Sequence, residues 1–427
     1  EGRGGWDRTK MDFNIFFETL IKLIADWWWL ILPVILYGIF FELWVEYAIN
    51  RFLEATPRHL IEIKIPKEVS KSPRAMESIL GQMHGMHRNL LRAERFIDGE
   101  IPLTISLEIA GFDGQVHFYI RVPQVRKRWL MSQIYAQYPS AEIIDPAEDY
   151  TYKVPLDAGL TQESGWEMIG TEFQLNKETY YPIKTYIDWE LEKAAKTEEK
   201  VDPIANIVEL FSLTNINEHF WFQMVLEPHF GWEKEGFKEI EKLSGRKIEE
   251  IPSFMESLKA GLKESLQALN PLTQSKTQKE EKFEFRWPNE AETQLMKAIY
   301  KKCSKVGWAT TLRILYLAQK DRFVKRHGYA FLGLLRPLTG ENGIRLDTST
   351  ITKIDYFFKD FRVFERKRAI LKKYRWRSAD FSKNKKFILN IEELATIYHF
   401  PGREAPSPTV QRVEFEKGAP PGTLPTI

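Results

Sequence analysis

The stretch LTISLEIAGFDGQVHFYIRV, residues 103–122, carries the clearest fold signal in the chain. Apolar residues occupy every second position from Leu103 to Ile109 and again from Val116 to Val122. Gly111 to Gly114 separates the two runs. Period-two alternation interrupted by glycine is the pattern of two antiparallel strands joined by a tight turn. The stretch therefore predicts a β-hairpin.

The segments on either side of the hairpin complete a βαββαβ order over residues 58–150. A short apolar strand is expected at Leu60–Ile65, followed by a helix that carries apolar residues from Ala75 to Met83. After the hairpin, Pro123 opens a helix that ends near Tyr138-Pro139, and Ala141–Ile144 supplies the last strand. This order is typical of a ferredoxin-like α+β sandwich.

A second unit of the same kind is predicted over residues 165–320. Its expected elements are strands in Phe173–Ile187, a helix at Ile204–Leu213, a strand at His219–Glu227, a helix at Glu290–Cys303 and a strand at Trp308–Ala318. A charged helical insertion at about residues 231–281 interrupts this unit. The predicted fold class is α+β with two ferredoxin-like sandwiches.

The only concentration of charge lies in the following region, residues 321–400. Between Lys359 and Lys386, twelve basic residues face three acidic ones, a local net charge of +9. Aromatic residues interleave with the basic ones in segment 357–387, a pattern found in nucleic-acid-binding modules. The candidate contacts with nucleic acid or anionic lipid are Arg366, Lys367, Arg368, Lys372, Lys373, Arg375 and Arg377.

An alternative explains the same segment without a ligand. Phe357, Phe361, Phe364, Ile370 and Tyr374 roughly follow helical spacing, which predicts a core stripe with the charges on its solvated face. From residue 401 to 427 the chain is rich in proline and glycine and is expected to form an extended connector.

Near the N-terminus, residues 23–50 are predicted to form a membrane anchor behind an amphipathic lead-in, residues 1–22. Segment 27–41 has no charged residue, and aromatic residues stand at both ends of the anchor as in the two belts of a spanning helix: Trp27, Trp28, Trp29, Trp44 and Tyr47. A helix lying in the membrane plane is the main alternative. A cleaved signal peptide is disfavoured, because no small-residue cleavage site follows.

Composition and motifs exclude several classes of protein. The net charge is only +2, and one cysteine with eight histidines provides neither disulfides nor a zinc ribbon. The sequence lacks a phosphate-binding loop of the G-x-x-x-x-G-K-[ST] type and the G-x-S-x-G and H-E-x-x-H motifs. We therefore expect no cofactor, no metal and no catalytic site, and a reducing cytosolic setting for the soluble part.

Four segments together resemble a known family: EIKIPKEVSKSPRAMESIL, SLEIAGFDGQVHFYIRVP, SQIYAQYPSAEIIDPAEDY and ILNIEELATIYHFPG, the last followed by PPGTLP. They are similar to the membrane-anchored region preceding the motor domain of conjugation-type (type IV secretion) DNA-transfer ATPases, as found in candidate-phylum bacteria. The resemblance covers most of residues 60–427 and rests on structural rather than catalytic motifs.

The resemblance implies a non-catalytic docking or assembly role at the inner face of a bacterial inner membrane. Implied partners are the lipid bilayer, secretion-type ATPase or channel subunits, and further copies of the chain. Any ATPase activity would lie in another domain or a partner chain, so two alternatives stay open: a fragment or split gene, and a stand-alone membrane subunit. A free-standing membrane scaffold and a membrane-associated nucleic-acid-binding module are the competing functions.

Overall fold

The computed structural model of the protein describes residues 29, 32–65, 71–86, 90–189, 202–244, 288–353, 355, 357–378 and 387–401. The chain divides into two compact units. Unit 1 comprises Glu1–Pro57 and Arg88–Leu103, and unit 2 comprises Arg58–His87 and Thr104–Ile427.

Unit 1 contains a helix, Leu32–Ala55, that is long and apolar enough to cross a membrane. Its 24 residues span about 36 Å at 1.5 Å per residue, more than the ~30 Å of a bilayer core. Only 6% of its most apolar window is buried within the protein. Within the predicted anchor, Trp29, Trp44 and Tyr47 are exposed, whereas Trp27 and Trp28 and the lead-in lie outside the described residues.

The same unit folds a short segment back against this helix. This segment contains helix α3, Arg92–Phe96. Trp44 Nε1 of the apolar helix donates a hydrogen bond to the Phe96 carbonyl at 3.1 Å, and the ring centres of Phe41 and Phe96 lie 5.6 Å apart. Gly99, with φ +69°, allows the closest approach, because a Cβ there would come within 2.2 Å of the Ala48 carbonyl carbon. The C-terminal half of the apolar helix therefore has a protein partner on one side.

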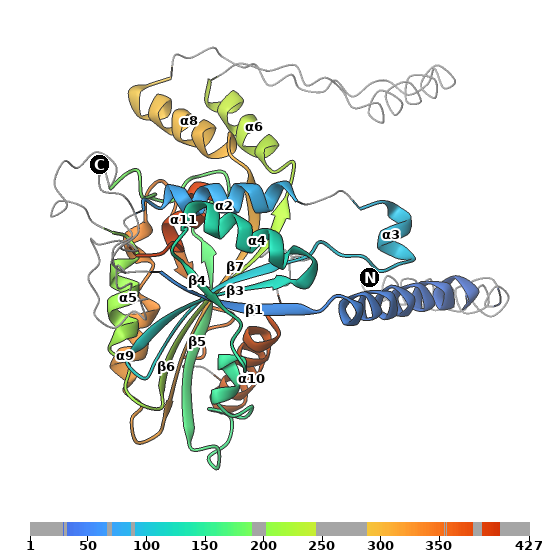
Figure 1. Cartoon of the computed structure of the whole chain (residues 1–427). Coiled ribbons are helices and arrows are strands. Elements are labelled where there is room, and N and C mark those ends of the chain that lie inside the picture. Colours follow the sequence, from blue (N-terminus) through green and yellow to red (C-terminus); the bar gives the residue numbers. More distant parts are fainter. Residues whose placement is uncertain are drawn as a thin grey trace, which may run out of the picture. The chain divides into compact units, whose positions relative to one another are not determined.

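Unit 2 is built on one sheet whose described strands number nine (Figure 1). The strands are β1 Arg58–Lys64, β2 Ile105–Phe112, β3 Gln115–Pro123, β4 Glu142–Ile144, β5 Trp166–Leu175, β6 Glu218–His229, β7 Gly307–Gln319, β8 Ile344–Leu346 and β9 Phe387–Asn390. Their order is β4-β1-β3-β2-β6-β7-β5-β8, with β9 paired to β7, and every pairing is antiparallel. The protein thus combines helices with an antiparallel sheet, as its α+β class requires.

The two halves of the sheet repeat one strand order. Numbered along the chain within each half, both β4-β1-β3-β2 and β8-β5-β7-β6 run 4-1-3-2. The halves meet where β2 pairs with β6, from Ile105↔Leu226 to Phe112↔His219. The segments predicted as two separate sandwiches are therefore joined in one sheet. Physically, the pairing satisfies backbone groups that β2 and β6 would otherwise leave exposed as edge strands.

Helices cover both faces of this sheet. The first face packs against α2 Arg74–Gly85, α4 Gln124–Gln137, α5 Ala205–Ser212, α9 Lys325–Leu332 and α11 Ile391–Ile397. Helices α5 and α9 lie side by side in Figure 1, with the rings of Phe211 and Phe331 5.4 Å apart. The opposite face packs against α10 Lys359–Trp376 and the 3-10 turn η1 Tyr150–Lys153.

The quoted hairpin forms largely as the alternation predicts. The turn is narrower than Gly111–Gly114, because Gly111 and Phe112 still belong to β2. Asp113 and Gly114 both have positive φ, 53° and 71°, as a two-residue hairpin turn requires. All eight residues of β2 are buried, although alternation is typical of a strand with one solvated side. The reason is that Arg377, which follows α10, and Tyr150 of η1 cover the polar side of the strand.

The predicted insertion, residues 231–281, is described only at its start, where α6, Glu233–Ser244, forms. Helix α6 packs against α8, Glu290–Cys303, the helix predicted for the second unit, around Trp232, Ile299 and Ile388. Residues 245–287 lie outside the described part of the chain, as does the predicted connector beyond residue 401.

Candidate functional site

A row of polar side chains crosses the centre of the sheet beneath α10. Glu108 of β2 stands opposite Gln223 of β6, Gln223 opposite Arg313 of β7, and Arg313 opposite Glu172 of β5. Arg313 donates from Nε to Glu172 Oε1 at 2.7 Å and from Nη1 to Gln223 Oε1 at 3.1 Å. Gln223 donates from Nε2 to Glu108 Oε1 at 3.1 Å. The register of four strands therefore produces one continuous hydrogen-bonded chain.

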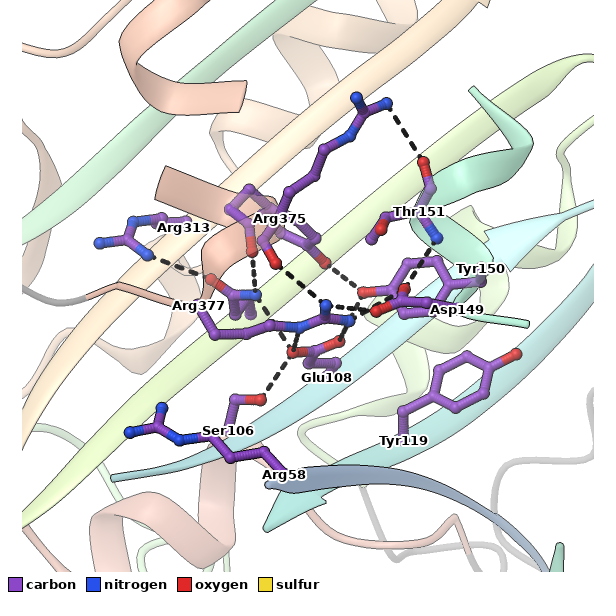
Figure 2. A network of polar contacts seen from close by, with 12 residues as sticks. Arg58, Ser106, Glu108, Tyr119, Asp149, Tyr150, Thr151, Arg313, Arg375 and Arg377 are labelled. Carbon is purple, nitrogen blue, oxygen red and sulfur yellow. Dashed lines mark hydrogen bonds and ion pairs between the residues drawn. The ribbon is translucent and has the colours of Figure 1, made fainter. Parts of the chain in front are cut away.

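The C-terminal end of α10 closes over this row (Figure 2). Gln223 Nε2 also donates to the Tyr374 carbonyl at 3.0 Å, and Arg313 Nη1 donates to the Lys373 carbonyl at 3.2 Å. The last carbonyls of a helix have no partner within the helix. Here the backbone N–H groups of Arg377 and Ser378 and the two side chains from the sheet share these carbonyls, which holds the end of α10 against the sheet.

Arg377, the residue that follows α10, is the central cation of the network. It adopts a left-handed conformation, φ 49°, which turns its side chain down into the protein. Its Nε and Nη2 donate to the two carboxylate oxygens of Glu108 at 2.9 and 3.1 Å, and its Nη1 contacts Asp149. This two-pronged pairing of guanidinium with carboxylate is the strongest form of charge-assisted hydrogen bond.

The remaining acceptor positions of Glu108 are also filled. Ser106 Oγ donates to Oε1 at 2.6 Å and the Tyr150 hydroxyl donates to Oε2 at 2.8 Å, as Figure 2 shows. Burial alone would raise the pKa of Glu108, but the Arg377 charge and these hydrogen bonds hold it below its ordinary value. Burial and the nearby Glu108 charge raise the pKa of Tyr150 well above its ordinary value.

The network is closed to solvent. The side chain of Glu108 is 0% exposed and that of Arg377 is 4% exposed. A charge in such a setting is stable only while its partner is present. The arrangement keeps the Glu108 carboxylate ionised and connects four strands to the end of α10. It offers no accessible surface to a substrate.

Five of the seven basic residues singled out in the sequence point inward. Arg366 donates to the carbonyls of Thr348 and Ile351, and Lys367 pairs with Glu167. Lys373 Nζ lies 3.6 Å from a carboxylate oxygen of Glu172. Arg375 donates to the Val154 and Pro155 carbonyls at 2.5 and 2.9 Å, and Arg377 forms the pairs described above. Arg368 and Lys372 remain exposed. The basic character of this helix largely serves to attach it to the sheet.

The predicted aromatic core stripe is correct for only half of α10. Ile370 and Tyr374 are buried, and Tyr374 stacks on Trp221 with ring centres 5.2 Å apart. The other three residues of the stripe, Phe357, Phe361 and Phe364, are 88%, 68% and 38% exposed. Helical spacing alone therefore did not place these rings, and Phe357 precedes the helix.

Sequence reasoning missed the polar row itself. Gln223 and Arg313 sit within the apolar runs HFWFQMVLE and WATTLRILYL, and both are 0% exposed. A single polar residue inside an otherwise buried strand was the available signal, because such a residue requires a buried partner. Among the described residues, no group of three histidine, cysteine or acidic side chains is placed to hold a metal ion.

These features define a class of protein: an α+β sheet protein with an N-terminal helix of membrane-spanning length and a buried network of polar and charged side chains at the centre of its sheet. The chain belongs to the family described as a domain of unknown function (DUF8128), whose model matches residues 49–412. No curated protein matches the chain. The family match covers the end of the apolar helix and nearly all of unit 2.

Proposed function

We propose that the chain is a non-catalytic, membrane-tethered docking and assembly subunit, or the N-terminal part, of a type IV secretion (conjugation-like) ATPase system. The observation that carries the proposal is the apolar helix Leu32–Ala55, which leaves nearly all of its most apolar window unburied within the protein. In this proposal the helix crosses the bacterial inner membrane once and unit 2 lies in the cytosol.

The buried network is consistent with a structural role for unit 2. Its charged groups are paired and shielded, so they contribute rigidity to a platform. The repeated 4-1-3-2 strand order, with helices between the strands, supports the proposal that each half is a ferredoxin-like unit. The partners in this proposal, ATPase or channel subunits and further copies of the chain, are those that the sequence resemblance implies.

Membrane extraction followed by native mass spectrometry tests the proposal. The chain should resist alkaline carbonate extraction, and a complex released in mild detergent should contain a chain with a phosphate-binding loop in a fixed ratio. A variant with Leu36→Arg and Ile39→Arg should lose membrane retention, because each arginine costs about 2.5–3.5 kcal/mol at a helix centre. The matched control Glu54→Arg, near the end of the helix, should stay in the membrane.

Two results would contradict the proposal. Release of the unmodified chain from the membrane by carbonate would contradict the proposed membrane attachment. Recovery of the chain only with copies of itself would contradict the proposed docking role and favour a free-standing scaffold.

A nucleic-acid-binding module is the second candidate. Its support is the outward position of Arg368, Lys372 and the 71% exposed Trp376 on α10. A genuine phosphate contact requires affinity for an oligonucleotide to fall steeply as salt rises. A Lys372→Ala variant should then reduce the slope of that fall by about one unit.

A further inference from the structure

A basic cleft of about 790 Å³ lies beside the N-terminal half of α10. The ends of β5 and β7, helix α9 and the loop before α10 contribute to it. Five lysines line it: Lys320, Lys325, Lys353, Lys359 and Lys367. Such a concentration of ammonium groups around one cavity attracts anionic groups.

The carboxylates of the cleft neutralise only part of this charge. Glu167 pairs with Lys367, and the fully exposed Asp355 lies 4.0 Å from Lys359. Within the described part of the chain, no carboxylate forms an ion pair with the other three lysines. Lys320 Nζ donates to a backbone carbonyl and Lys353 Nζ lies 4.5 Å from the centre of the Tyr329 ring. The lining therefore carries a net charge of +3.

Apolar side chains share the lining with these lysines. Met168 and Ile169 of β5, Phe323, and Val363 of α10 contribute hydrocarbon or aromatic surface. A ligand that matches both parts combines an anionic group with an apolar one. An inorganic ion would leave the apolar part unused.

The outer face of α10 adds a second feature of the same kind. Phe357, Phe361 and Trp376 are 88%, 68% and 71% exposed. Within α10, Phe361, Arg368, Lys372 and Trp376 follow one another at spacings of seven, four and four residues and so lie on one stripe of the helix, and Phe357 lies two residues before its start. Exposed aromatic rings combined with basic residues are typical of helices that lie at a membrane interface.

We propose that this cleft binds the phosphate head group of an anionic phospholipid, with the outer aromatic residues of α10 resting in the membrane interface. The inference rests on the proposed membrane attachment, which keeps lipid at high local concentration. Lysine ammonium groups bind phosphate as point charges, and the apolar lining takes the start of the acyl chains. A nucleic acid is disfavoured as the ligand, because five of the nine basic side chains from Lys359 to Arg377 point into the protein.

The test uses the full chain purified in a neutral mild detergent. Isothermal titration calorimetry with short-chain phosphatidylglycerol should show saturable binding, and short-chain phosphatidylcholine should bind at least tenfold more weakly. The variant Lys325→Glu/Lys353→Glu should weaken phosphatidylglycerol binding at least tenfold. The control Lys234→Glu/Lys297→Glu makes the same charge change on exposed residues of α6 and α8, and it should bind within about twofold of the unmodified chain.

Three outcomes would overturn the assignment. Equal weakening in the control variant would show a bulk charge effect. Equal affinity for glycerol phosphate, which lacks acyl chains, would identify a soluble phosphate compound as the ligand. Competition by a single-stranded oligonucleotide with higher affinity than the lipid would identify a nucleic-acid site. Carbonate extraction is a separate readout, so loss of the tether and loss of the lipid site are distinguishable.

Discussion

Replacing Arg377 by methionine is the sharpest test of the buried network. The change removes the guanidinium that pairs with Glu108 and Asp149 and leaves a fully buried carboxylate without its main cation. Loss of one partner of a buried ion pair costs about 3–5 kcal/mol. Methionine keeps a long side chain, and the left-handed backbone strain at φ 49° is the same for both residues. The free energy of unfolding should therefore report the lost pairing.

Urea unfolding followed by tryptophan fluorescence measures this change, because Trp221 stacks directly on Tyr374 at the end of α10. With a slope of about 3 kcal/mol per molar urea, the midpoint should fall by about 1 M. The control Arg368→Met removes an exposed arginine, 3.8 Å from Glu365, and should change stability by about 0.5 kcal/mol or less. Equal shifts in the two variants would refute the argument that the buried pair locks α10 to the sheet.

Three further predictions concern other parts of unit 2. Because the pKa of Glu108 is lowered in the folded protein, its ionised form stabilises the fold above its ordinary value of 4.5. The stability difference between the unmodified chain and Glu108→Gln should thus shrink as pH falls below about 4.5 in urea titrations. Burial lowers the pKa of His219 to about 4, so the unmodified chain should lose stability from about pH 6.5 down to 4. His219→Phe should remove that loss, since Nδ1 of this histidine has no hydrogen-bond partner among the described residues; an unchanged pH profile would contradict this account. Gly111→Ala should destabilise by about 1–3 kcal/mol, because its Cβ would lie 2.6 Å from the Phe211 carbonyl oxygen. Gly85→Ala, which meets no atom within 4 Å, should be neutral or stabilising, and thermal melts of the two variants measure the difference.

The hairpin and the long central strands were predictable from sequence because their signals are local. The alternation in residues 103–122 identifies β2 and β3, and the apolar runs at 219–227 and 308–318 fall within β6 and β7. Helix α8 was predicted with its observed bounds, Glu290–Cys303, from its amphipathic pattern, and in the structure Asn289 and Glu292 form a capping box at its start.

Other features were unpredictable because they depend on contacts between distant segments. The pairing of β2 with β6 has no local signature, because a buried edge strand and a buried central strand show the same apolar sequence pattern. The direction of the charges on α10 depends on which face meets the sheet. The buried row of Glu108, Gln223 and Arg313 depends on the register of three strands, and one polar residue per strand does not disclose it.

The junction between β2 and β6 has a consequence for synthesis on the ribosome. Phe112 and Glu218 lie 106 positions apart, so β2 is complete long before its partner exists. At about 5–20 residues per second, the nascent chain waits roughly 5–20 s with one edge of this largely apolar strand unpaired, because only β3 is available to pair with it. During that interval β2 is an available edge for another nascent chain or for a chaperone. Slow translation between residues 112 and 218 would then lower the yield of soluble protein even though the final structure is unchanged.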